Sequence, residues 1–149
     1  MYKTAKILEK TLNMSMLYYF FSIKEKENAY LFDHLNISKN KEALKHQNKY
    51  PTILISLKEM KSSSFKAQII SFSNIIYELL EKNLEILSSA QLTDTTKKKL
   101  NSLHDETTSI EDLKFSLRVI SNALYTHYHQ KVIVLIDEYD VPLQSAYQN

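Results

Sequence analysis

Residues 132–140 read VIVLIDEYD, and this stretch decides the fold class of the chain. Five consecutive apolar residues, mostly β-branched, end abruptly in two carboxylates. Such a run is typical of a strand buried on both faces of a parallel sheet. Asp137 and Glu138 then lie at the carboxyl end of the strand, where open α/β sheets bind their ligands. The stretch therefore predicts an α/β fold with an acidic pair at one edge of its sheet.

A second short apolar run predicts a neighbour for this strand. Pro51 precedes residues 52–57, TILISL, and a proline at the start of a strand costs little because it removes only a terminal backbone donor. Two strands joined by helices indicate a parallel pair, since parallel neighbours need a crossover connection. We therefore expect a mostly helical domain with a small parallel sheet, its strands near 52–57 and 132–136. Apolar residues at helical spacing predict helices over residues 12–23, 41–48, 65–87, 93–103 and 109–128.

The composition of the 149 residues is that of one globular domain, expected over residues 1–149, with 44% hydrophobic and 24% charged residues. A net charge of +2 is too small to indicate nucleic-acid binding. Cysteine is absent, which excludes disulfides and thiolate chemistry. No apolar stretch is long enough to span a membrane, and residues 1–10 lack the apolar centre of a signal peptide. We therefore expect a cytoplasmic protein without a membrane partner.

Glycine is also absent, although an average usage of roughly 7% would give about ten. Asparagine is then the residue expected at backbone positions with positive φ. The absence also bears on Lys10 and Thr11, which precede the helical pattern at Leu12. In a phosphate-binding loop a glycine-rich turn ends in Lys-Thr, where the lysine neutralises phosphates and the threonine coordinates Mg²⁺. Here Glu9 stands in the glycine position, so the residues alone favour an ordinary helix start.

The acidic pair has two interpretations that its residues leave open. If a nucleotide binds, Asp137 would hold Mg²⁺ through water, and Glu138 would orient or polarise the attacking water. Alternatively, the two residues are surface acids where a strand passes into a loop. His127 and His129 are no alternative metal site, because residues two apart on a helix point to different faces.

Four segments of the chain, taken in order, resemble the AAA-ATPase-like family of bacterial proteins, whose members often carry a C-terminal restriction-endonuclease-like nuclease domain. Lys10 and Thr11 match the family's Phe-Gly-Lys-Thr turn, while Glu9 replaces its glycine. The family's first strand, its later strands and its nuclease domain have no counterpart, so the chain resembles a truncated internal slice. The four segments are residues 10–17 (KTLNMSML), 46–51 (HQNKYP), 109–113 (SIEDL) and 132–142 (VIVLIDEYDVP).

The resemblance implies an incomplete P-loop NTPase-like three-layer α/β fold with ATP and Mg²⁺ as cofactors. It assigns Lys10, Thr11 and Asp137 to cofactor binding, Thr11 and Asp137 to the metal, and Glu138 to catalysis. We expect ATP hydrolysis to be impaired, because phosphoryl transfer depends on positioned electrostatics that the missing glycine loop would supply. The alternative is a non-enzymatic interaction module, which would pair with a protein partner or another copy through an exposed sheet edge, or a gene remnant.

Overall fold

The computed structural model describes residues 2–62, 64–105 and 108–147, and within these ranges the side chains of residues 11–145. The chain separates into two compact units. The first unit comprises residues 1–54 and 130–137, and the second comprises residues 55–129 and 138–149. None of the described helices is long and apolar enough to cross a membrane.

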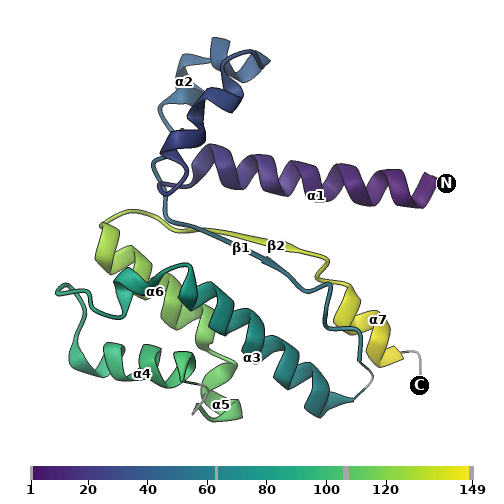
Figure 1. Cartoon of the computed structure of the whole chain (residues 1–149), viewed down its shortest axis with the longest axis vertical. Coiled ribbons are helices and arrows are strands. Elements are labelled where there is room, and N and C mark those ends of the chain that lie inside the picture. Colours follow the sequence, from purple (N-terminus) through teal and green to yellow (C-terminus); the bar gives the residue numbers. More distant parts are fainter. Residues whose placement is uncertain (1, 63, 106–107, 148–149) are drawn as a thin grey trace. The chain divides into compact units, whose positions relative to one another are not determined.

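The first unit contains a long helix and most of a two-stranded parallel sheet (Figure 1). Helix α1 (Tyr2–Phe21) packs against strand β2 (Ile133–Asp137), which pairs with strand β1 (Thr52–Ser56). Between α1 and β1 the chain forms two 3₁₀ helices and one short α-helix. The predicted α/β class and its small parallel sheet are thus confirmed, whereas the P-loop character of the fold stays a prediction. The three short helices are η1 (Lys26–Phe32), η2 (Asn36–Lys39) and α2 (Lys41–Leu44).

Strand β2 differs from the sequence-based expectation in its burial. Val134 is 41% exposed and Ile136 is 37% exposed, whereas Asp137 at the end of the strand is only 4% exposed. Successive side chains of a strand point to opposite faces. The prediction that the apolar run is buried on both faces is therefore wrong, because alternate residues of β2 keep substantial contact with solvent.

Helix α1 also differs from the prediction, because it begins at Tyr2 rather than at Leu12. Residues 2–11 contain neither proline nor glycine, the two residues that most strongly disfavour a helix interior. Nothing in the sequence therefore ends the helix upstream of Leu12. As a consequence, Lys10 and Thr11 lie inside α1 and do not open it.

Asn48 closes the carboxyl end of α1. Its backbone φ is 53°, and its amide nitrogen Nδ2 donates hydrogen bonds to the carbonyl oxygens of Tyr19, at 3.0 Å, and Ser22, at 2.9 Å. The backbone N–H of Asn48 donates to the carbonyl of Phe20 at 2.7 Å. Asn48 thus combines a left-handed backbone with satisfaction of carbonyls that a helix end leaves without partners. This is the role expected of asparagine in a chain without glycine.

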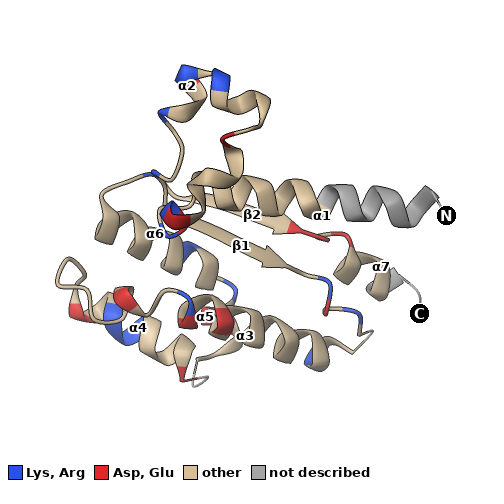
Figure 2. Cartoon of the chain, turned by 45° about the horizontal axis from the view of Figure 1, so that its top comes forward, with Lys and Arg blue, Asp and Glu red and all other residues tan. Residues whose placement is uncertain are grey.

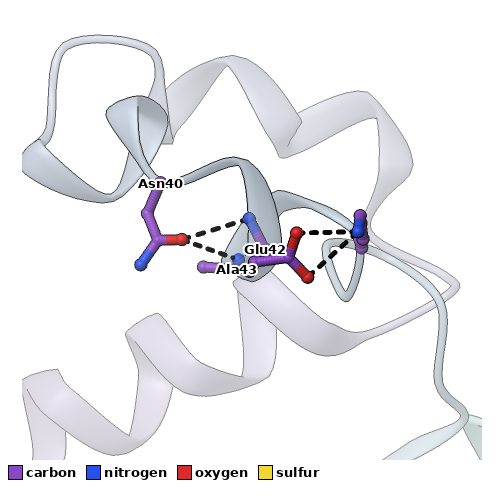
Figure 3. Close-up of polar contacts among 4 residues, drawn as sticks. Asn40, Glu42 and Ala43 are labelled. Atoms are coloured by element: carbon purple, nitrogen blue, oxygen red, sulfur yellow. Dashed lines mark hydrogen bonds and ion pairs between the residues drawn. The ribbon is translucent and has the colours of Figure 1, made fainter.

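Helix α2 is shorter than the predicted range of 41–48, but it is well capped (Figure 3). The side-chain oxygen Oδ1 of Asn40 accepts hydrogen bonds from the backbone N–H groups of Glu42 and Ala43, each at 3.1 Å. Lys45 Nζ donates to both carboxylate oxygens of Glu42, at 2.7 and 3.0 Å. The cap satisfies donors that a four-residue helix cannot satisfy internally.

The second unit is helical, and its core forms where α3, α4 and α6 pack on one another (Figure 1). Leu80 of α3, Leu100 of α4 and Ile120 of α6 are each 0% exposed. Its elements are α3 (Phe65–Glu81), the 3₁₀ helix η3 (Leu84–Ile86), α4 (Asp94–His104), α5 (Ile110–Leu113), α6 (Ser116–Tyr128) and α7 (Val141–Tyr147).

Two of the helices expected here are interrupted. The helix predicted over residues 65–87 ends at Glu81, and the buried Asn83 donates from Nδ2 to the carbonyl of Leu79 at 2.7 Å. An asparagine that bonds its local backbone competes with helix continuation. The helix predicted over residues 109–128 divides between Leu113 and Ser116 into α5 and α6.

Side-chain oxygens cap two helices in this unit. Thr93 Oγ1 accepts from the backbone N–H of Thr96 at 3.2 Å, and Ser109 Oγ accepts from that of Asp112 at 3.1 Å. Both residues stand at the N-terminus of their helix, where a side-chain oxygen replaces a missing carbonyl partner.

Candidate functional site

Thr11 and Asp137 meet within the first unit. Thr11 Oγ1 donates a hydrogen bond to Asp137 Oδ2 at 3.0 Å. Thr11 is an exposed residue of α1, and Asp137 is the buried last residue of β2. The packing of α1 on β2 therefore places a hydroxyl beside a carboxylate at the carboxyl end of a strand. This is the edge at which the sequence predicted a ligand site.

The two side chains offer the ligand chemistry of a hard cation. Magnesium prefers oxygen ligands, keeps several waters, and is commonly held by one or two carboxylates together with substrate phosphates. Across the described part of the chain, no group of three or more His, Asp or Glu side chains lies close enough to hold a metal ion. Thr11 and Asp137 therefore fit a metal that arrives with a phosphate-bearing ligand, and they do not form a complete cage. Their role as metal ligands stays a prediction.

Glu138 follows Asp137 with a left-handed backbone, φ 51°. For a residue with a Cβ atom this conformation costs roughly 1–2 kcal/mol. Such outliers persist where the surrounding structure enforces them, and they cluster at functional sites. The conformation turns the chain sharply just after Asp137, so the two acids do not continue the alternation of the strand. The catalytic role of Glu138 stays a prediction.

The described residues supply fewer groups for binding phosphate than for binding a metal. The side chain of Lys10 lies outside the described residues. Thr11 lies inside α1, whereas phosphate loops direct the free N–H groups of a helix N-terminus at the ligand. Since the chain also lacks glycine, its residues supply a hydroxyl and a carboxylate but no glycine-built cradle.

The segment HQNKYP, residues 46–51, fixes the end of α1 beside the start of β1. Tyr50 N–H donates to the carbonyl of Phe21 at 3.0 Å, and Ile23 N–H donates to that of Tyr50 at 2.8 Å. His46 stacks on the Tyr50 ring and bonds its hydroxyl. These contacts, with the Asn48 cap, anchor the helix that carries Thr11. The sequence predicted a helix over residues 41–48 and a strand after Pro51, but it did not predict the contacts by which this segment positions the end of α1.

Comparison with protein families found one match for the chain. One family model, described as Predicted AAA-ATPase, matches residues 8–149. No curated protein and no solved structure matches the chain significantly. The matched range includes Thr11, Asp137 and Glu138 and covers nearly the whole sequence. On this match, the chain belongs to the AAA-ATPase-like family.

Proposed function

We propose that Thr11 and Asp137 of the first unit hold Mg²⁺ together with a nucleoside triphosphate, ATP by family membership, and that the chain hydrolyses the nucleotide poorly. The hydrogen bond between Thr11 Oγ1 and Asp137 Oδ2 carries the proposal. It joins the two groups that the family resemblance assigns to the metal, although they are far apart in the sequence. The family match supports the nucleotide as the accompanying ligand.

Each candidate residue has a separate task in this proposal. Thr11 would coordinate the ion, and Asp137 would hold one of the waters bound to it. Both roles require the present hydrogen bond between Thr11 Oγ1 and Asp137 Oδ2 to break. The bound metal would supply neutralisation of the phosphate charge. Lys10 would contribute a positive charge to the phosphates, and Glu138 would orient the attacking water.

Hydrolysis is impaired in this proposal because the phosphates lack a preorganised cradle. Phosphoryl transfer relies on positioning and on electrostatic stabilisation by groups already in place. With Thr11 inside α1 and glycine absent, backbone N–H groups are not arranged around the phosphates. We therefore expect binding weaker than micromolar and very slow turnover.

Calorimetric titration of the full chain with ATP tests the proposal. We expect binding that requires Mg²⁺ and that falls about tenfold in Thr11→Val and Asp137→Asn, since tenfold corresponds to about 1.4 kcal/mol. Thr11→Ser keeps the hydroxyl and serves as the matched control. Absence of Mg²⁺-dependent binding by the folded chain would overturn the site, and micromolar affinity abolished by Lys10→Ala would contradict the impaired cradle.

The exposure of Val134 and Ile136 favours a second candidate function, pairing of the sheet with another polypeptide. A two-stranded sheet has two edges, and unpaired edges are templates for added strands. Light scattering after size-exclusion chromatography would show self-association that Ile136→Lys reduces. A monomer at all concentrations, with little exposed apolar surface, would weaken this candidate.

A further inference from the structure

A cleft of about 300 Å³ lies in the second unit, between α4 and the segment formed by α5 and α6. One wall of the cleft is lined by residues of α4, among them Thr95, Lys98, Lys99 and Ser102. Their spacing of three and four places them on one face of the helix. Figure 2 shows basic residues gathered along α4. The opposite wall includes Arg118 of α6, so cations face the cleft from two elements.

Among the described residues that line this cleft, positive charges outnumber negative charges. Lys98, Lys99 and Arg118 contribute three positive charges, and Asp112 contributes one negative charge. The Asp112 carboxylate already accepts a hydrogen bond from Ser109 Oγ at 2.9 Å. Among the described residues, the ion pairs found do not include any of these three cations. An anion bound in the cleft would therefore meet an excess of positive charge.

Arg118 is held in place before any ligand arrives. Its guanidinium carbon lies 4.7 Å from the centre of the Phe115 ring, which also lines the cleft. Stacking on an aromatic face restricts a long side chain while leaving the donor fork at its edge available. The hydroxyl groups of Thr95 and Ser102 also line the cleft and add further polar groups.

We propose that the cleft between α4 and α6 binds a small phosphorylated ligand, with its phosphate between Arg118 and Lys98 or Lys99. A phosphate group carries up to two charges and several acceptor oxygens, which suits three cations better than a single carboxylate would. The cleft volume is that of a small-molecule site rather than of an extended polymer groove. The site is distinct from the nucleotide site proposed for the first unit, and Asp112 supplies the one carboxylate among the described residues that line it.

The test is titration of the full chain with inorganic pyrophosphate in the presence of EDTA, followed by amide NMR shifts. We expect saturable binding that shifts the amides of Ser102 and Arg118. Arg118→Gln should weaken it about tenfold or more, and Arg118→Lys should weaken it less, because the bidentate fork is lost while the charge is kept. Lys66→Gln removes an equally exposed charge from α3 in the same unit and should leave affinity unchanged.

Further arms separate this proposal from the nucleotide site. Asp137→Asn should leave metal-free pyrophosphate binding intact, whereas it should weaken Mg²⁺-nucleotide binding. Equal losses in Arg118→Gln and Lys66→Gln would show diffuse charge attraction and overturn the proposal. Loss of binding in Asp137→Asn, no binding by the folded chain, or an oligonucleotide that binds the cleft in preference to pyrophosphate would overturn it as well.

Discussion

The hydroxyl of Thr11 lies 3.0 Å from the carboxylate of Asp137, and the bond links α1 to the end of β2. Because Asp137 is 4% exposed, its carboxylate has little access to water as a substitute partner. Hydrogen bonds to charged groups contribute roughly 1.5–3 kcal/mol when one partner is removed. The contact therefore matters for the stability of the first unit, apart from any ligand that it serves.

A double-mutant cycle measures this contact. We expect Thr11→Val and Asp137→Asn each to lower the free energy of unfolding, and the double variant to lose about 1–2 kcal/mol less than the sum of both. Urea denaturation of the four proteins provides the measurement. Additive losses would mean that the two side chains do not interact in solution.

Asn48 allows its backbone and side-chain contributions to be separated. Asn48→Gly keeps the left-handed backbone but removes two hydrogen bonds to carbonyls at the end of α1, for an expected loss of about 2–3 kcal/mol. Asn48→Ala adds a Cβ atom without a compensating bond and should cost about 1 kcal/mol more. Thermal and urea unfolding would measure both losses. Equal stability of the two variants would contradict a role for the positive φ.

His104 makes the stability of the second unit dependent on pH. The hydrogen bond to Glu81 at 2.6 Å, and then the one to Asp105 at 3.3 Å, raise the pKa of His104, while Tyr77 stacks on its ring. A raised pKa means that the stabilisation is fully present below pH 6.5, the usual value, and is lost as the pH rises through the folded-state pKa.

The comparison of wild type with His104→Gln tests this dependence. The difference in the free energy of unfolding should be larger at pH 5.5 than at pH 8.5, and Glu81→Gln should reduce the pH dependence because it removes the main partner. NMR titration of the imidazole gives the pKa directly. A pKa at or below the usual value would contradict the hydrogen bond between His104 of α4 and Glu81 of α3.

The two strands should respond differently to truncation of an isoleucine. Ile53 of β1 is 0% exposed, and Ile53→Ala should cost about 2–5 kcal/mol through lost burial and the cavity left behind. Ile136 of β2 is 37% exposed, so Ile136→Ala should cost about 1 kcal/mol. Chemical denaturation would compare them. Equal losses of stability would mean that the side chain of Ile136 is buried in solution.

Much of the fold follows from local sequence. The two apolar runs predicted β1 and β2 to within one residue at each end, and the helices predicted to begin at residues 93 and 109 begin at Asp94 and Ile110. The helix breaks were missed because an apolar stripe continues across Asn83, where a side-chain bond to Leu79 ends α3. The exposure of Val134 was missed because a hydrophobic run does not reveal how many layers cover it.

For the candidate site, sequence identified the residue types, and structure supplied their pairing. Asp137 was identified from its place after an apolar run, and Thr11 from a short motif whose usual glycine is missing. Their proximity depends on how α1 lies along β2, a long-range packing choice that no local pattern encodes. The start of α1 at Tyr2 was missed because no cap or breaker marks the expected boundary at Leu12.

His129 and Glu138 also have positive φ among the described residues, and both stand next to points where the backbone passes between the two units. The third passage falls inside β1, after Leu54. A glycine at either of these positions would have many accessible backbone conformations, whereas a residue with a Cβ atom has few. The absence of glycine thus narrows the backbone conformations open at residues 129 and 138, and His129→Gly or Glu138→Gly would widen that range.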